Sequence, residues 1–251
     1  MRSSFTVRAL RPLIVATLVV AGLAMSATLA TAQAPPAAKA KPLNILLVGA
    51  SGMIGSRILS EAASRGHHVT AAARHPDKIA KGLNITAVAL DATDAAALTA
   101  LAKNADAIVM ATSPRSTGKP LEEAKALGDA GIAAAKASGK RLFIVGGAAS
   151  LNTAEGKPVM ETLPPAYRTG EPLGMRNVLD TLKKSDITWT FFSPAVQIRP
   201  GTKTGKYRLG TSTVIADAKG DSRISAEDFA DAVVNELENP KYLKSQMTIG
   251  Y

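Results

Sequence analysis

The stretch Asn44-Ile-Leu-Leu-Val-Gly-Ala-Ser-Gly-Met-Ile-Gly55 decides the fold of this chain. It opens with an apolar run suited to a buried strand, and Gly49, Gly52 and Gly55 then follow at intervals of three. The next stretch, Ile54–Arg65, carries apolar residues at helical spacing. A strand, a glycine-rich turn and a helix in this order are typical of a dinucleotide-binding site.

Each glycine has its own role in that pattern. Gly49 permits the sharp turn out of the strand, Gly52 lets a pyrophosphate approach the backbone, and Gly55 lets the helix pack close to the sheet. The first N–H groups of the helix and the positive end of its dipole would face the phosphates. The residues expected to contact the cofactor here are Gly49, Ser51, Gly52, Met53, Ile54 and Gly55.

Beyond this unit, short apolar runs alternate with longer helical patterns. Strands are predicted at Val69–Ala73, Ile85–Leu90, Ala107–Ala111, Leu142–Val145, Thr188–Phe192 and Met247–Ile249. Helices are predicted from Thr93 or Asp94 to Lys103, and at Leu121–Ser138, Glu171–Lys184 and Ala226–Glu238. This alternation predicts one α/β domain over residues 43–251, a Rossmann-type, doubly wound parallel sheet with helices on both faces. Segments 147–170 and 194–224 interrupt the pattern, and we expect them at the ligand-binding edge of the sheet.

Residues 1–34 differ in composition from the rest of the chain. Three arginines precede an apolar stretch, and small residues follow, ending in Ala32-Gln33-Ala34. This layout predicts a secretory signal peptide, cleaved after Ala34 or, as a second option, after Ala32. Export to the periplasm follows from it, and residues 35–42 would form a linker. The alternatives are an uncleaved membrane anchor, or a translation start at Met25 that leaves a cytoplasmic protein.

The composition excludes several other classes of protein. The chain has 251 residues, 46% of them hydrophobic, which suffices for one domain with a real core. Because it has no cysteine, it forms no disulfide, Cys-ligated zinc site, iron–sulfur cluster or thiol nucleophile. No metal site is expected from its three histidines, which lie in one short stretch. The net charge is +10, and +7 without the three arginines of residues 1–34, which favours acidic small ligands or anionic surfaces; without a Lys/Arg block, no nucleic-acid partner is expected.

The ends of the later strands suggest which dinucleotide binds. Arg74 follows the second strand, where a site for NAD would carry an acid, and a guanidinium there can pair with a 2′-phosphate. The sequence therefore predicts NADP(H) in preference to NAD(H), unless Arg74 is simply solvated. Asp91, after the third strand, would meet the adenine or cap the next helix. Ala111 and Thr112, after the fourth, would border the ribose or belong to an ordinary turn.

These motifs together resemble a known family. The run Asn44–Lys78 is similar to the NAD(P)H-binding atypical short-chain dehydrogenase/reductase group, which includes NmrA-like proteins and the flavin reductase–biliverdin reductase B type. Later stretches that resemble its bacterial members are Arg141–Ala148, Trp189–Ala195, Gly201–Gly210 and Ile224–Ala230. The resemblance implies one Rossmann-type domain that binds NADP(H), and often an oxidoreductase.

The chain departs from the wider short-chain dehydrogenases at one motif. Their Tyr-x-x-x-Lys pair, in which the lysine lowers the pKa of the proton-transferring tyrosine, does not occur here. Candidates at the nicotinamide side are instead Ser193 and Pro194 for cofactor contact, and Ser150 and Tyr167 for catalysis. The alternative for Ser150 is a loop-capping hydroxyl, and the alternative for Tyr167 is a packing residue.

Three readings of the function remain at this point. The first is an NADP(H)-binding oxidoreductase that reduces a flavin, quinone or carbonyl compound, because such a reaction can depend on the cofactor more than on protein groups. The second is a non-catalytic NAD(P)-binding sensor, and the third an NAD-dependent epimerase or dehydratase-like enzyme. The expected partner is a small-molecule substrate, and the expected assembly a monomer or homodimer, with membrane contact only if the signal stays uncleaved.

Overall fold

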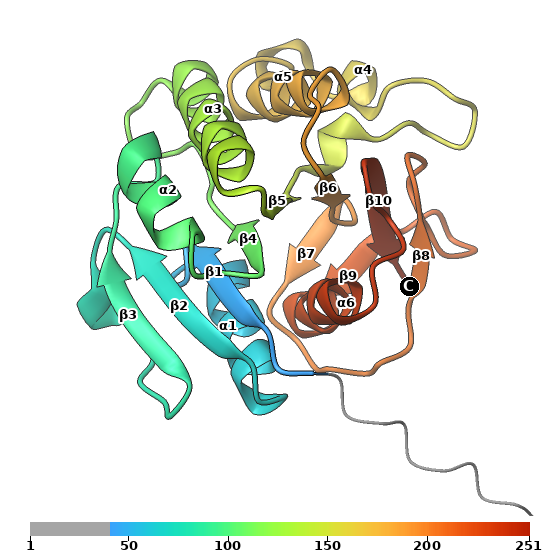
Figure 1. Cartoon of the computed structure of the whole chain (residues 1–251). Helices are drawn as coiled ribbons and strands as arrows, with labels where there is room; N and C mark the ends of the chain where they lie inside the picture. Colours follow the sequence, from blue (N-terminus) through green and yellow to red (C-terminus); the bar gives the residue numbers. More distant parts are fainter. Residues whose placement is uncertain (1–40) are drawn as a thin grey trace, which may run out of the picture. The chain divides into compact units, whose positions relative to one another are not determined.

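A computed structural model describes residues 41–251, which fold around a central sheet of eight strands (Figure 1). The strand order is β3-β2-β1-β4-β5-β6-β10-β8. These strands are β1 (Asn44–Val48), β2 (His68–Ala73), β3 (Ile85–Ala89), β4 (Ala107–Met110), β5 (Arg141–Val145), β6 (Trp189–Ser193), β8 (Arg208–Gly210) and β10 (Ser245–Gly250). The signal peptide expected at 1–34 and most of the linker expected at 35–42 lie outside the described residues.

Helices cover both faces of the sheet, as predicted. Helices α1 (Met53–Ser64) and α6 (Ala226–Glu238) pack on one face, and α2 (Ala95–Ala102), α3 (Pro120–Ser138) and α5 (Glu171–Lys183) on the other. Strand β1 shows why both faces need a cover, because its apolar side chains alternate between them. Ile45 and Leu47 join the core under α1 and α6, whereas Leu46 and Val48 join the core under α2, α3 and α5. The Rossmann-type α/β fold is therefore confirmed.

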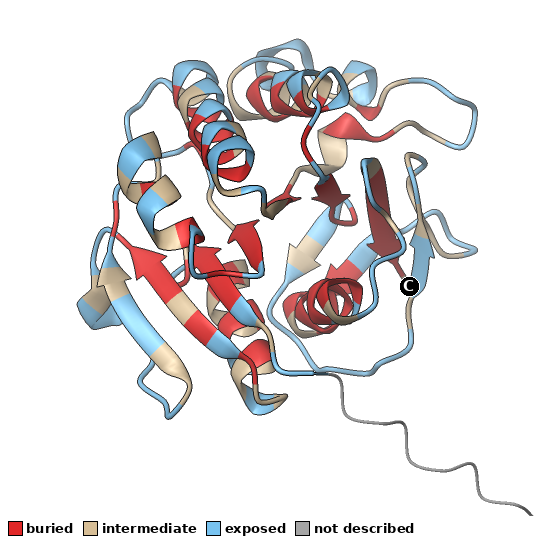
Figure 2. Cartoon of the chain, viewed as in Figure 1, coloured by how far each residue is buried: buried red, intermediate tan, exposed pale blue. Residues whose placement is uncertain are grey.

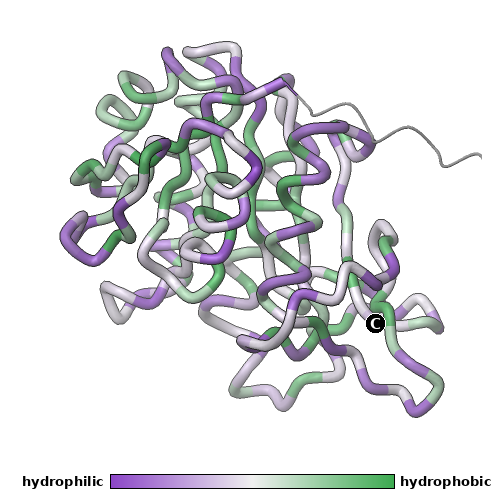
Figure 3. Tube along the Cα trace, turned by 90° about the horizontal axis from the view of Figure 1, so that it is seen from below, coloured by the Kyte–Doolittle hydropathy of each residue, from purple (hydrophilic) through white to green (hydrophobic). Residues whose placement is uncertain are grey.

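The burial and hydropathy of the chain follow this layered arrangement. The inner strands and the sheet-facing sides of the helices are buried (Figure 2). Seen from below, hydrophilic residues mark several of the outer connecting segments (Figure 3). No helix within residues 41–251 has both the length and the apolar character needed to cross a membrane.

The structure corrects the prediction in the two irregular segments. Segment 194–224 contains three short strands, β7 (Gln197–Arg199), β8 and the beginning of β9 (Arg223–Ser225), and β8 runs antiparallel to β10. The sheet is thus mostly, not wholly, parallel. Segment 147–170 contains one turn of helix, α4 (Val159–Thr162), and three short 3₁₀ turns lie at Pro76–Lys78, Ala148–Ser150 and Pro165–Tyr167. Elements of three or four residues are too short to carry a readable hydrophobic period.

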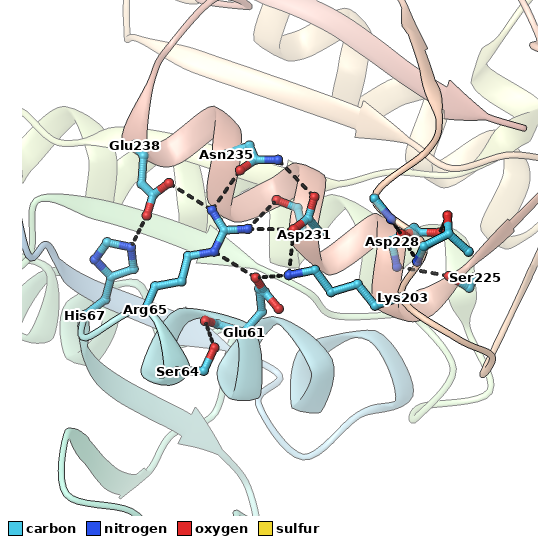
Figure 4. Close-up of polar contacts among 12 residues, drawn as sticks. Glu61, Ser64, Arg65, His67, Lys203, Ser225, Asp228, Asp231, Asn235 and Glu238 are labelled. Atoms are coloured by element: carbon cyan, nitrogen blue, oxygen red, sulfur yellow. Dashed lines mark hydrogen bonds and ion pairs between the residues drawn. The ribbon is translucent and has the colours of Figure 1, made fainter. Parts of the chain in front are cut away.

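A cluster of mostly buried ion pairs joins α1 to α6 (Figure 4). Arg65 donates to the carboxylates of Glu61, Asp231 and Glu238, at 2.7, 2.8 and 2.8 Å. Lys203, from the segment that follows β7, bonds Glu61 at 2.6 Å and Asp231 at 2.7 Å. The cluster therefore fixes this segment against both helices.

Asp228 holds the same segment one turn away on α6. Its fully buried carboxylate accepts hydrogen bonds from the backbone N–H groups of Thr204 and Gly205, and from the hydroxyls of Thr204 and Tyr251. Burial alone would raise the pKa of Asp228, but these hydrogen bonds outweigh it and hold the pKa below its ordinary value.

This lowered pKa predicts acid-sensitive stability. The folded-state pKa lies below the unfolded one, so the carboxylate stabilises the fold above about pH 4 and loses that contribution as the pH falls further. Asp228→Asn should lower the free energy of unfolding strongly at pH 7, and this loss should shrink as the pH approaches 3. Urea denaturation at several pH values measures both. Asp129→Asn, at an exposed carboxylate on α3, is the control and should change little at any pH. A loss of constant size for Asp228→Asn would contradict this account.

Candidate nucleotide-binding groove

A groove of about 790 Å³ lies at the carboxyl ends of the parallel strands. The last residue of a strand or the first residue after it lines the groove at Val48, Ala73, Leu90, Ala111, Val145 and Pro194. It opens beside β1 and β4, where the chain first crosses to the other half of the sheet. Open α/β sheets bind ligands in such a crevice.

The glycine turn forms one end of the groove. Gly49 has φ +86°, a conformation that L side chains rarely adopt, and a Cβ on it would lie 2.4 Å from the carbonyl oxygen of Ala111. A Cβ on Gly55 would lie 2.1 Å from the carbonyl oxygen of Gly49. Gly55 does not line the groove. It lies in the first turn of α1, behind the glycine turn, at the point where this helix packs against that turn. The turn and the start of α1 are therefore held together by close backbone contact.

The start of α1 leaves backbone donors available to a ligand. Gly52 is the N-cap and supplies no side-chain cap, and the first turn carries no acid. Within residues 41–251, no acceptor is present for the N–H groups of Met53, Ile54 and Gly55. Unpaired donors and a positive helix dipole end suit the phosphates of a dinucleotide, so the residues present fit this cofactor.

Arg74 and Asp91 lie on the groove wall beyond the turn. The part of the chain that the structure describes gives Arg74 no carboxylate partner within ion-pair distance. Asp91 accepts hydrogen bonds from the N–H of Thr93 at 2.9 Å and from its hydroxyl at 2.7 Å. These two bonds lower the pKa of Asp91, with a smaller contribution from the charge of Arg74. Asp94, rather than Thr93, caps α2 by accepting from two backbone N–H groups.

The opposite end of the groove has an apolar wall. Its walls include Leu127, Pro172, Met175, Val196 and Ile198, together with the backbone of Gly146–Ala149. Such a wall excludes water from a flat ring bound there. Val196 and Ile198 lie in the segment 194–224 that was expected at this edge of the sheet, whereas Leu127 and Met175 were not predicted as contacts, because they fit the apolar pattern of a helix.

Two glutamates fix the segment between β4 and α3 over this end. Glu171 accepts from the hydroxyl of Ser113 at 3.1 Å and from Arg115 at 2.6 Å. Glu123, which is nearly buried, accepts from both the backbone N–H and the hydroxyl of Ser116 and of Thr117. Burial would raise the pKa of Glu123, but these bonds outweigh it and lower the pKa. Neither glutamate was predicted as a site residue, since both resemble ordinary acids of a first helical turn.

The structure does not bring the two predicted catalytic residues to the groove. The Ser150 hydroxyl donates to the carbonyl of Gly147 at 2.7 Å and lies 2.8 Å from the Ser193 hydroxyl. Gln246 donates to both hydroxyls, so all three side chains belong to one buried cluster. Tyr167 is 67% exposed and does not line the groove.

Most predicted cofactor contacts do line the groove. These are Gly49, Ser51, Gly52, Met53, Ile54, Arg74, Asp91, Ala111, Thr112 and Pro194. Gly55 and Ser193 do not, because the first lies behind the turn and the second is buried at the end of the inner strand β6. The geometry thus supports the predicted cofactor contacts better than the predicted catalytic residues.

Fold and groove together define a Rossmann-type nucleotide-binding protein. A family model described as NAD(P)H-binding matches residues 49–240 of this chain. The chain therefore belongs to this NAD(P)H-binding family, and the predicted resemblance is confirmed.

Three solved structures are similar to this chain over nearly their whole length. One from Bacteroides thetaiotaomicron, described as a "putative epimerase", is 38% identical, with a TM-score of 0.76, and the match covers 84% of this chain and 98% of that chain. One from Burkholderia pseudomallei, described as a "putative exported protein", is 39% identical, with a TM-score of 0.71 and coverage of 83% and 100%. A "putative NADH-flavin reductase" from Streptococcus pneumoniae is 27% identical, with a TM-score of 0.72 and coverage of 83% and 99%.

Proposed function

We propose that this protein is an NADP(H)-dependent reductase whose acceptor is a flavin or a quinone. One observation carries the choice of acceptor: the described residues that line the groove include no tyrosine, histidine, lysine or cysteine. Among the lining carboxyl groups, Asp91 and Glu123 are poor proton donors at neutral pH, because hydrogen bonds hold their pKa values below the ordinary value. A carbonyl acceptor needs a proton as its alkoxide forms, whereas a flavin or quinone can take its proton from water.

Each part of the groove has a role in this reaction. The N–H groups at the start of α1 bind the diphosphate, and Arg74 pairs with the 2′-phosphate. The apolar walls around Met175 and Ile198 orient the reacting rings and exclude water. When bound, the nicotinamide supplies the hydride. Glu123 and Glu171 keep the segment over the acceptor in place.

The preference for NADP(H) predicts an asymmetric effect of one substitution. Arg74→Ala should raise the Kd for NADPH about 10- to 100-fold, the value of a charge-assisted hydrogen bond, and should change the Kd for NADH less than about threefold. Quenching of cofactor fluorescence measures both constants. Lys78→Ala removes a nearby positive charge that does not line the groove, and serves as the control. Equal weakening of both cofactors by Arg74→Ala would remove the specificity argument.

The acceptor is tested by turnover. NADPH oxidation should be observed with FMN, riboflavin or a benzoquinone, and should be slow or absent with aldehydes and ketones. Turnover of carbonyl compounds alone would overturn the assignment. Tight cofactor binding without turnover of any acceptor would favour the second candidate, a nucleotide sensor, which the missing proton donor also fits. The epimerase reading has less support, because proton transfer to the substrate would again need a donor in the groove.

We also propose that the protein is exported. The layout of residues 1–34 supports this, as does the similarity to the Burkholderia pseudomallei structure with its description. Cell fractionation followed by N-terminal sequencing tests it, and a mature chain that begins at Pro35 or Gln33 in the periplasm is expected. A cytoplasmic protein that begins at Met25 would contradict export.

A further inference from the structure

A second pocket, of about 500 Å³, lies on the α5 face of the sheet beside β6 and β10. The 3₁₀ turn Ala148–Ser150 separates it from the nucleotide groove, since Ala148 and Ala149 line the groove and Ser150 lines the second pocket. Helix α5 covers this face as far as β6 (Figure 1). The pocket is thus a separate site, beyond the edge of that helix.

Strand β10 presents polar side chains to this face. Met247 and Ile249 point into the apolar core under α6. The alternate residues, Gln246 and Thr248, are also buried, at 8% and 0% exposure, yet they are polar. Gln246 donates to the hydroxyls of Ser150 and Ser193, and Gln246 and Ser150 both line the pocket, so its floor on this side is polar.

The pocket walls carry a surplus of positive charge. Arg176, Lys183 and Lys244 line it against a single carboxylate, Asp180, which lies 3.6 Å from Lys183. One terminal nitrogen of Arg176, Nη1, is buried and has no hydrogen-bond partner within residues 41–251. Because Nη1 is closed to solvent, an anion in the open pocket would pair with the part of the Arg176 side chain that lines it.

Lys244 stands at the mouth of the pocket in an uncommon backbone conformation. Its φ of +50° makes it the one non-glycine residue with a positive φ in the part of the chain described. Its N–H donates to the carbonyl of Trp189 at 2.7 Å. This bond fixes the backbone from which the exposed side chain extends. Among residues 41–251, no carboxylate lies within ion-pair distance of its ammonium group.

The remaining walls offer neutral hydrogen-bonding groups. Asn152, Thr211 and Ser212 line the pocket, and within the described part of the chain their side chains form no hydrogen bonds. Backbone bonds fix two of these residues, because the N–H of Asn152 donates to the carbonyl of Ser212 at 2.7 Å and Val214 donates back to Asn152 at 2.9 Å. The side chains of all three are therefore free to bond a ligand in place of water.

We propose that this pocket binds a small anionic ligand that also carries hydroxyl groups, of the chemical class of a sugar phosphate. Arg176 and Lys244 would pair with the phosphate, and Asn152, Thr211 and Ser212 would bond the hydroxyls. The site is independent of the nucleotide groove and of the reaction proposed there.

Isothermal titration of the full chain with glucose 6-phosphate, inorganic phosphate and glucose tests the site, with and without saturating NADP⁺. Glucose 6-phosphate should bind in both conditions, and glucose at least about tenfold more weakly, because it lacks the charge. Arg176→Gln and Lys244→Gln should each raise the Kd for glucose 6-phosphate about tenfold. Lys184→Gln, the neighbour of Lys183 that does not line the pocket, and Arg74→Ala in the groove should change it less than twofold.

Lys244 is exposed, so its substitution tests the site even if Arg176→Gln fails to fold. Absence of heat with either phosphate would overturn the proposal. So would equal binding of glucose and its phosphate, or unchanged affinity in Lys244→Gln. Displacement of the sugar phosphate by NADP⁺ would place the binding in the groove and would likewise overturn it. Failure of NADP⁺ itself to bind would instead count against the proposed function alone.

Discussion

Gly49→Ala should lower the free energy of unfolding by about 3 kcal/mol or more and should abolish measurable NADPH binding. Two costs combine at this position. The backbone has φ +86°, and a methyl group would lie 2.4 Å from the carbonyl oxygen of Ala111. The contact is with backbone at the end of β4, so relief requires the turn to move away from β4. The N–H groups at the start of α1 would then shift from the position that binds the diphosphate.

Substitutions at two other glycines distinguish the cost of the backbone conformation from the cost of the steric clash. Gly66 has nearly the same backbone, with φ +90°, but nothing lies within 4 Å of a Cβ there, so Gly66→Ala should cost only about 1 kcal/mol. Gly52→Ala adds a methyl 3.3 Å from the carbonyl oxygen of Gly49, which the fold can tolerate, yet it crowds the phosphate position. It should therefore weaken NADPH binding far more than stability. Urea denaturation and fluorescence titration measure the two effects, and equal stability losses for Gly49→Ala and Gly66→Ala would contradict the clash.

Glu236→Ala should destabilise the protein by about 3–5 kcal/mol, because it leaves a buried charge without its partner. Arg141 and Glu236 form an ion pair at 2.6 Å, with side chains only 10% and 4% exposed. Arg141 also donates to the hydroxyl of Thr190 and to the carbonyl of Glu236, and the Glu236 carboxylate accepts from the N–H groups of Lys241 and Tyr242. The pair thus joins β5, β6 and the segment after α6.

A double substitution distinguishes the buried charge from simple loss of packing. Arg141→Met combined with Glu236→Leu removes both charges at similar volume and should recover much of the stability lost in Glu236→Ala. Asp186→Ala is the exposed control, because its pair with Lys136 has side chains 74% and 67% exposed, and it should cost less than about 0.5 kcal/mol. Thermal or urea unfolding measures all three. A double variant as unstable as Glu236→Ala would show that the charges themselves are not the cause.

The fold was predictable where local pattern and long-range packing agree. The apolar run of β1 is buried on both faces, and its glycine turn has the conformation and close contacts that demand glycine. Both facts can be read from one sequence, because buried parallel strands and tight turns restrict residue type strongly. β7, β8 and β9 were missed because three residues stabilised by pairing with distant strands leave no local signal.

The candidate site was predictable only in part, for a related reason. Gly52 and Arg74 lie next to strand ends, where chain order alone fixes their position at the groove. Ser150 also follows a strand, but its side chain turns toward Ser193 and Gln246, and Gln246 is 96 residues away in sequence. A single sequence does not reveal which partner such a hydroxyl will meet. Glu123 and Glu171, which hold the segment over the groove, were missed because the sequence does not reveal which hydroxyls and N–H groups their carboxylates will meet.

The two edges of the central sheet differ in what they offer to a neighbouring molecule. β3 forms one edge with five uncharged residues, Ile-Thr-Ala-Val-Ala, whereas β8 forms the other with three residues that begin with Arg208. Long, uncharged edge strands invite pairing with another chain, and short, charged ones resist it. Self-association of this protein during refolding or storage should therefore begin at β3, and a lysine introduced there should improve its solubility.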